Sequence, residues 1–202
     1  MSLVELIAQA DERGLAASGL ACLDRCLPLL GGDDEVLRPL WAGLAEGQDA
    51  EGWGEYLEQA RGKLGEAGPA ESAGDEAALL ARRMLAAAPA GRSAAEVRVW
   101  ADACSVASLR IHRLLDPAAR LPAAGGLAQH GASSVDAGRA GRTDAMSPLV
   151  AAELRRQITV LELLSEHGVG GLRRALEVST EGRRVLRAVV SRRARGARGR
   201  SA

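Results

Sequence analysis

Cysteine and histidine, the residues that most often hold metal ions, are scarce in this sequence of 202 residues. Cys22 and Cys26 lie four residues apart, a spacing that places both thiols on one face of a helix. A structural metal site needs four nitrogen or sulfur ligands, but His112, His130 and His167 show no paired spacing that would complete the set. The stretch around the two cysteines is rich in leucine. We therefore interpret them as buried, inert thiols and expect no metal ion and no cofactor.

Ser108, His112 and Asp116 follow one another at intervals of four residues, so they could form a hydrogen-bonded string along a helix. A working nucleophile also needs an oxyanion site and a substrate pocket, which one straight helix face does not provide. Asp116 precedes Pro117, where a capping or turn role is natural. The glycines of residues 168–171 follow a predicted helix rather than a strand, so they do not match a phosphate-binding loop. We expect no catalytic residue in either group.

The C-terminal segment carries the one sharper binding hypothesis. Residues 172–176 and 180–193 predict two helices joined by Glu177, Val178 and Ser179, and this pattern resembles a helix-turn-helix in outline. Arginines on the second helix would face outward, and those that follow it would form a tail along the phosphate backbone of DNA. The candidate nucleic-acid-binding residues are Arg183, Arg184, Arg187, Arg192 and Arg193.

The same segment also departs from a DNA-binding motif. The first helix is short, Glu177 occupies the turn where glycine is common, and Glu181 would point toward phosphates. No aromatic residue is present in it to stack on the bases of a single strand. We favour the alternative interpretation, a terminal helical hairpin with a solvated arginine face. Lys63 is the one lysine among 26 basic residues, and a GC-rich coding sequence favours such a use of arginine.

The elements that must position these residues are helices. Alanine, leucine, arginine and glutamate dominate, while phenylalanine is absent and tyrosine occurs once, so strand-forming residues are rare. Apolar residues recur at spacings of three and four along most of the chain. The sequence therefore predicts an all-α, multi-helix bundle of about eight helices. The stretches with this periodicity are approximately residues 3–10, 15–30, 34–44, 50–64, 75–88, 94–115, 148–165, 172–176 and 180–191.

The periodicity divides the chain into four parts. Residues 1–115 predict a helical bundle domain. Residues 116–146 are rich in alanine, glycine, serine and proline, and a structureless stretch of this length is unusual inside a compact domain. We therefore expect a long flexible linker there. Residues 147–195 predict a basic C-terminal helical module, and residues 196–202 predict a disordered tail.

The net charge of zero conceals a strong asymmetry. Residues 1–80 contain 16 acidic and 5 basic residues, whereas residues 81–202 contain 10 acidic and 21 basic residues. The two halves carry −11 and +11, so they attract each other within one chain or between chains. Within one chain this attraction would fold the segment after the linker back onto the first helices. Between chains it would favour head-to-tail or antiparallel self-association.

These features favour a non-enzymatic interaction or regulatory protein that acts through charge-polarised helical surfaces, with a protein partner or a second copy. The first alternative is a DNA-binding regulator that uses the C-terminal arginines. The second is a small-molecule-binding or enzymatic helical bundle, with a pocket among Trp41, Trp53, Trp100, Cys104 and His112. No apolar run approaches membrane-spanning length, so we expect no membrane partner. The odd number of cysteines and an N-terminus unlike a signal peptide indicate a cytoplasmic location.

Overall fold

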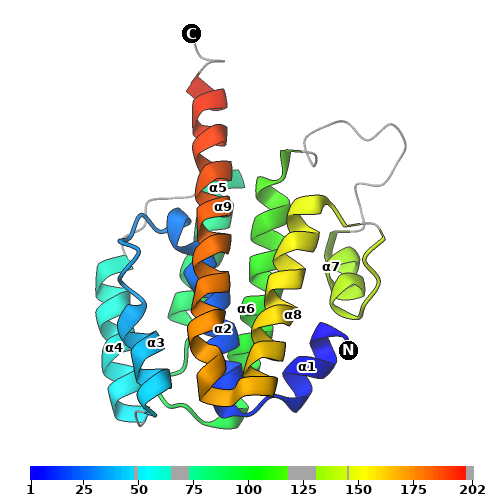
Figure 1. Ribbon diagram of the computed structural model, residues 1–202. Coiled ribbons are helices and arrows are strands. Elements are labelled where there is room, and N and C mark those ends of the chain that lie inside the picture. Colours follow the sequence, from blue (N-terminus) through cyan, green and yellow to red (C-terminus); the bar gives the residue numbers. More distant parts are fainter. Residues whose placement is uncertain (48–49, 65–72, 118–130, 145, 199–202) are drawn as a thin grey trace.

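The computed structural model describes residues 1–47, 50–64, 73–117, 131–144 and 146–198. All regular structure in these residues is helical, which confirms the predicted all-α bundle (Figure 1). In chain order the elements are α1 (Leu3–Gln9), α2 (Glu12–Cys26), η1 (Leu27–Leu29), α3 (Arg38–Glu46), α4 (Ala50–Leu64), α5 (Ala73–Ala86), α6 (Ala94–Leu115), α7 (Gly131–Arg139), α8 (Pro148–His167), η3 (Gly168–Gly171) and α9 (Leu172–Arg198).

Several helices begin at the capping signals that the sequence contains. Ser2 and Glu5 form a reciprocal capping box at the start of α1, with the Ser2 amide donating to the Glu5 carboxylate at 2.7 Å. The hydroxyl of Ser93 accepts from the amide of Glu96 at the start of α6. Ser147 caps α8 in the same way, ahead of the proline at its first helical position. These contacts satisfy amides that have no partner inside the helix.

Helix α2 is the centre of the bundle, and every residue from Gly14 to Cys26 is buried. It packs against α6, α8 and α9, which surround it in Figure 1. Gly19 permits the close approach of α6, because a Cβ atom there would lie 2.6 Å from Cζ3 of Trp100. Because so few of its positions are exposed, packing determines almost every residue of α2. The surrounding helices are therefore positioned by their contacts with α2.

The hydrophobic core is built mainly from leucine and alanine and runs from α1 to α9 without interruption. Its main aromatic contact joins Trp53 of α4 and Trp100 of α6, whose ring centroids lie 6.2 Å apart at an angle of 72°. Each indole donates to a backbone carbonyl, Trp53 to Pro89 at 2.9 Å and Trp100 to Met84 at 2.8 Å. The polar edge of each ring is therefore satisfied while its body fills the core.

Helix α7 lies inside the range 116–146 that the sequence predicts as a linker. It is held by tertiary contacts, since Val135 is 2% exposed and Arg139 is 6% exposed. Among the residues of α7 whose burial is described, Val135, Gly138 and Arg139 are buried, and this gives too weak an apolar periodicity to be recognised in an Ala- and Gly-rich stretch. Residues 118–130 and 145 of the expected linker lie outside the described residues.

The C-terminal segment forms one helix, so the predicted break at residues 177–179 is wrong. Ser179 is fully buried, and its hydroxyl donates to the carbonyl of Ala175 at 2.9 Å. The residue read as part of a turn therefore satisfies its hydrogen bond inside the helix. Residues 196–198, expected to begin the disordered tail, continue α9, and residues 199–202 lie outside the described residues.

Helices α8 and α9 share the core of the first half of the chain. Leu154 and Leu161 of α8, and Leu172 and Leu186 of α9, belong to the same continuous cluster of buried residues as the leucines of α2. The range 147–195 therefore does not form a core separate from that of residues 1–115. The C-terminal helices of the basic half therefore pack against the helices of the acidic half within one chain. Attraction between opposite charges would favour this arrangement.

Candidate functional site

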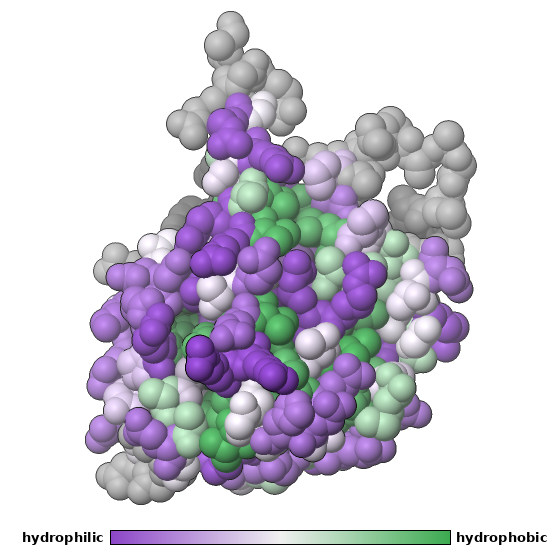
Figure 2. Space-filling view, viewed as in Figure 1, coloured by the Kyte–Doolittle hydropathy of each residue, from purple (hydrophilic) through white to green (hydrophobic). Residues whose placement is uncertain are grey.

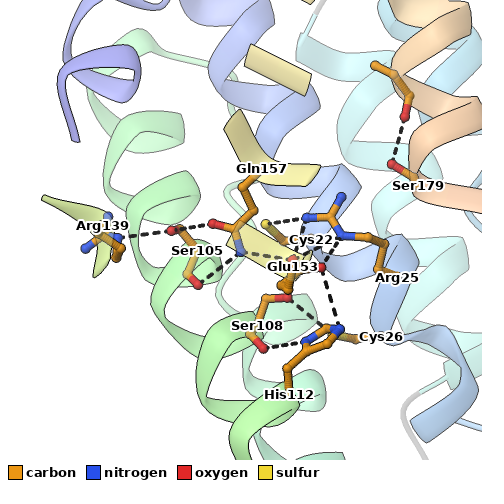
Figure 3. Close-up of polar contacts among 11 residues, drawn as sticks. Cys22, Arg25, Cys26, Ser105, Ser108, His112, Arg139, Glu153, Gln157 and Ser179 are labelled. Atoms are coloured by element: carbon orange, nitrogen blue, oxygen red, sulfur yellow. Dashed lines mark hydrogen bonds and ion pairs between the residues drawn. The ribbon is translucent and has the colours of Figure 1, made fainter. Parts of the chain in front are cut away.

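A group of buried polar side chains joins α2, α6 and α8 at the centre of the bundle (Figure 3). Arg25 of α2 donates from Nε and Nη2 to the carboxylate of Glu153 of α8, with Nη2 2.7 Å from Oε1. Oε1 of Glu153 also accepts from Ser108 at 2.7 Å and from Gln157 at 2.9 Å. Neither charged side chain has any exposed surface. Burial opposes ionisation of Glu153, but the adjacent Arg25 outweighs it and lowers the pKa of Glu153 to about 2.

The group continues from Gln157 toward the surface beneath α7. The hydroxyl of Ser105 donates to Oε1 of Gln157 at 2.7 Å, and Nε of Arg139 donates to the same hydroxyl at 3.1 Å. Arg139 also pairs with Asp102, which is half exposed. Ser105 and Asp102 lie on α6, so Arg139 attaches α7 to that helix. The network thus connects four helices, α2, α6, α7 and α8, by hydrogen bonds and ion pairs.

His112 lies beside the Arg25–Glu153 pair and is wholly buried. Its Nδ1 is 2.8 Å from the carbonyl oxygen of Ser108, which can only accept, so Nδ1 carries the hydrogen. Its Nε2 has no hydrogen-bond partner among the described residues and lies 3.6 Å from Oε2 of Glu153. Burial lowers the pKa of His112 despite the nearby carboxylate, and the neutral form therefore dominates at pH 7.

The expected string of Ser108, His112 and Asp116 does not form a nucleophile and base. The hydroxyl of Ser108 donates to Glu153, and the imidazole contacts the backbone carbonyl of Ser108 rather than its hydroxyl. Ser108 has no exposed surface, so no substrate reaches it in this conformation. The hydrogen bonds of Ser108 and His112 are therefore structural, because each side chain pairs with a neighbouring polar group of the bundle.

The three cysteines are free and buried, as the leucine-rich surroundings indicate. Burial raises the pKa of the Cys22 thiol to about 12, and it also raises the pKa values of Cys26 and Cys104. All three therefore remain thiols at neutral pH, the unreactive form. In the part of the chain that the structure describes, no group of three or more histidine, cysteine or acidic residues could hold a metal ion.

The pocket proposed among the tryptophans is filled by packed side chains. Trp41, Trp53 and Trp100 are at most 4% exposed, and Cys104 and His112 have no exposed surface. Trp41 donates from Nε1 to the Asp24 carboxylate at 3.0 Å. These residues form a closed core rather than a ligand site.

A second buried network fastens α9 to α2. Arg183 forms an ion pair with Asp24, and both side chains are at most 8% exposed. The same guanidinium donates to the backbone carbonyl of Asp34 at 3.1 Å. Arg187, one turn later, pairs with the carboxylate of Asp34, and this hydrogen bonding lowers the pKa of Asp34. Attraction between the acidic and basic halves is therefore realised in specific contacts.

These contacts place the five predicted nucleic-acid-binding arginines in different settings. Arg183 is buried, so the expectation that it faces outward is wrong. Arg187 is committed to Asp34, and Arg193 donates to the carbonyl of Leu114 at 2.8 Å. Arg184 is exposed and pairs loosely with Glu181 at 3.6 Å. Arg192 is exposed near the end of α9. The structure thus does not gather the five into one free surface.

Other arginines bind the carbonyl ends of helices on which they do not lie. Arg98 of α6 donates to the last carbonyls of α1, including that of Ala8 at 2.9 Å. Arg61 of α4 donates to the carbonyl of Ala86 at 3.0 Å, at the end of α5. Arg193 does the same for α6. The C-terminal carbonyls of a helix lack internal partners and carry partial negative charge, so these arginines stabilise helix ends.

A surface hollow of about 320 Å³ lies between α1, the start of α2 and the end of α8. Leu6, Leu161 and Leu164 form part of its wall, together with the polar residues Asp11 and Ser165. The Asp11 carboxylate caps α2 by accepting from the amide of Gly14 at 2.7 Å. The carboxylate in the hollow is therefore already engaged in a structural contact.

No protein-family model matches the chain, and no curated protein and no solved structure matches it either. In the described ranges, no helix is both long enough and apolar enough to cross a membrane.

The polar network was not anticipated from the sequence, although one signal for it exists. Glu153 and Gln157 lie four residues apart and alternate with Val150, Leu154 and Leu161 on the inward face of α8. Polar residues at inward positions of an amphipathic helix indicate buried hydrogen bonding. Their partner Arg25 lies 128 residues away in the sequence, and no local pattern reveals such a pairing.

Proposed function

We propose that this chain is a non-enzymatic interaction protein that associates with a second copy of itself through oppositely charged helical surfaces. The observation that supports this most directly is the end of α9. Its last turns extend beyond the neighbouring helices (Figure 1). Arg192 and Arg195 are exposed there and make no ion pair within the described residues. They are charged groups that the fold itself does not use.

The surroundings of this end have the composition of a protein interface. Figure 2 shows a hydrophilic surface over the upper part of α9, with apolar surface directly below it. Leu114, Val189 and Val190 are partly buried here and pack against the core. Arginine is enriched in protein–protein interfaces, and its guanidinium group pairs with carboxylates.

The chain also carries a complementary acidic surface. Glu46 of α3 and Glu55 of α4 are exposed, and these two helices lie on the side of the bundle away from α7, whereas the carboxylate of Glu58 pairs with Arg61. The net charge is zero, so two copies do not repel each other at long range. A basic end on one copy and an acidic side on another give a head-to-tail contact, in which two different surfaces meet.

DNA is the alternative partner for the same arginine-bearing end. No acidic residue follows Glu181 in the sequence, which favours contact with phosphates. However, the turn of a helix-turn-helix is absent, and Arg183 and Arg187 are engaged with aspartates. We therefore favour the protein partner and treat DNA binding as an outcome of the test.

Sedimentation velocity of the full chain over a range of protein concentrations, at low and high ionic strength, tests this proposal. We expect concentration-dependent association at low ionic strength that weakens as salt screens the charges. The variant Arg192→Glu/Arg195→Glu should stay monomeric. The matched control is Arg173→Glu/Arg174→Glu, which reverses the same number of exposed charges at the opposite end of α9 and should associate like the wild type.

A charge-exchange experiment identifies the second surface. Glu46→Arg/Glu55→Arg should also be monomeric alone, and mixing it with Arg192→Glu/Arg195→Glu should produce a heterodimer. A wild-type chain that remains monomeric at every concentration and ionic strength contradicts self-association. Salt-dependent binding of a duplex oligonucleotide that disappears in Arg192→Glu/Arg195→Glu but not in the control would assign this end to DNA instead.

A further inference from the structure

The turn that joins α8 to α9 depends on two of its three glycines. Residues 168–171 form η3 and reverse the direction of the chain between the two helices, which lie side by side in Figure 1. Gly168 has φ +52° and ψ −129°, a conformation that residues with side chains rarely adopt. A Cβ atom at Gly171 would overlap the backbone carbonyl of Leu163, whose carbon would lie 2.9 Å away. An alanine at either position therefore opposes this turn.

The other two residues of the turn contribute little to holding it closed. Gly170 does not have a positive φ, and a Cβ atom there would meet no atom within 4 Å. Val169 is 43% exposed although its side chain is apolar. Of the four residues, Gly171 is the one that is buried. The position of α9 is therefore maintained by the packing of the helix itself and not by contacts of the turn.

Helix α9 is fastened along its length to α2 and α8. Leu186 belongs to the common core, and Arg183 pairs with the buried carboxylate of Asp24. Gly182 lies directly against the side chain of Arg25. An α9 helix from a second copy of the chain would make the same contacts, because its sequence is the same. The surface that receives α9 thus fits the helix of either copy.

An α9 helix that left this surface empty would expose groups that are buried in the fold. Asp24, which is 1% exposed, would lose its cation, and a buried charge without a partner is strongly unfavourable. Leu172 and Leu186, which are at most 4% exposed, would enter water. The surface is therefore expected to hold an α9 helix from one copy or another. Residues 168–171, the connection between α8 and α9, decide which copy supplies it.

We propose that the surface of α2 and α8 that receives α9 also accepts α9 from a second copy of this chain, with residues 168–171 as the hinge. When these four residues become helical, α8 and α9 form one continuous helix that reaches the second copy, and each copy receives the other's α9. Glycine is a poor helix former, so the three glycines keep the wild-type turn closed. This exchange differs from the head-to-tail contact proposed above, which joins two closed chains through exposed charges.

The variant Gly171→Ala tests the exchange, because its methyl group opposes the turn and favours a helix through residues 168–171. We expect light scattering to give twice the monomer mass of 21.0 kDa. Gly170→Ala is the matched control and should stay monomeric. Both substitutions are made in the Arg192→Glu/Arg195→Glu background at high ionic strength, where the head-to-tail contact does not form. A failure of the exchange is therefore distinguishable from a failure of the head-to-tail proposal.

A cross-link distinguishes exchange from other kinds of dimer. Nη1 of Arg187 on α9 lies 3.0 Å from Oδ2 of Asp34, and the three native cysteines are buried. Asp34→Cys/Arg187→Cys therefore places two accessible thiols within reach of a short bis-maleimide. The reagent joins residues of one chain when α9 is closed and joins two chains when α9 is exchanged, and denaturing electrophoresis separates the products. We expect single chains with the wild-type turn and with Gly170→Ala, and linked pairs with Gly171→Ala.

A second hinge variant guards against simple misfolding of Gly171→Ala. Gly168→Ala opposes the turn through its φ alone, since a Cβ atom there would meet no atom within 4 Å. It should also form cross-linked pairs, in a smaller fraction than Gly171→Ala. If neither variant gives a dimer with cross-links between chains, whether it is folded or not, the proposal is wrong.

Discussion

Nη2 of Arg25 lies 2.7 Å from Oε1 of Glu153, and both side chains are completely buried between α2 and α8. Removing two charges from water costs several kcal/mol for each ion, which their attraction offsets only when the remaining polar atoms are also hydrogen-bonded. Ser108 and Gln157 meet that requirement for Glu153. The pair therefore fixes how α2, α6 and α8 are placed relative to one another, since another placement would separate the charges.

Removal of one member of this pair should be strongly destabilising. Arg25→Met leaves Glu153 buried beside an apolar side chain, and we expect the free energy of unfolding to fall by about 3–5 kcal/mol. Arg25→Met/Glu153→Met removes both charges, and it should recover a large part of that loss. Urea unfolding measures each value. Glu162→Gln, at an exposed position of α8, is the control and should change stability by less than about 0.5 kcal/mol. A loss for Arg25→Met as small as that of the control would contradict the structure.

Adjacent arginines of α9 should behave very differently. Arg183→Ala leaves Asp24 buried without its cation, and the cost should be about 3–5 kcal/mol. Arg184→Ala removes an exposed ion pair with Glu181, whose contribution is below about 1 kcal/mol. Chemical denaturation of the two variants under identical conditions gives the comparison. Equal effects would mean that Arg183 is not held in the buried pair.

Two glycines of α9 provide a matched test of how closely this helix approaches α2. Gly182→Ala places a methyl group 2.4 Å from Cδ of Arg25, so packing should be disturbed at a cost of about 1–3 kcal/mol. Gly196→Ala adds a methyl group with no atom within 4 Å, and its better helix propensity should stabilise the chain by up to about 1 kcal/mol. Thermal unfolding distinguishes the two signs. Stabilisation by both substitutions would show that α9 does not pack closely at Gly182.

Acid should destabilise the fold in two stages. The pKa of His112 is lowered below its ordinary value of 6.5 by burial, so the unfolded chain binds this proton more readily and stability declines as the pH falls below about 6.5. The pKa of Glu153 is lowered from 4.5 to about 2, so its contribution is complete above pH 4.5 and is lost as the pH falls toward 2. That second loss amounts to about 3 kcal/mol. Both stages appear in the free energy of unfolding measured against pH.

His112→Asn separates the two stages, because the asparagine amide can donate to the Ser108 carbonyl but cannot be protonated in this range. In this variant the decline should begin near pH 4.5 instead of pH 6.5. An unchanged pH profile would mean that His112 does not cause the first stage.

Local patterns in the sequence predict the helices well but not their pairing. Helices α4 and α6 begin and end at the residues that the apolar spacing indicates, because both present a regular stripe to the core. The continuity of α9 was missed because Ser179 and Arg183 interrupt its apolar stripe, although both are buried. Their partners, Ala175 and Asp24, show why polar residues are accommodated there.

The arginines show the limit of inference from composition. A run of basic residues at the C-terminus indicates a charged surface, but Arg183, Arg187 and Arg193 each bind an acceptor of this chain. Those acceptors lie on α2, on the segment before α3 and on α6, which only the tertiary structure brings near α9. The sequence does predict the attraction between the two halves, since that depends on total charge rather than on which atoms meet.

The burial of Asp24 and Arg25 on the central helix has a consequence for synthesis on the ribosome. Helix α2 emerges early, but Arg25 meets its carboxylate 128 residues later and Asp24 meets its arginine 159 residues later. A nascent chain that has reached only α6 would have to desolvate both charges without a counterion, so its first helices cannot close around α2. We therefore expect the bundle to close around α2 only after α8 and α9 have been translated.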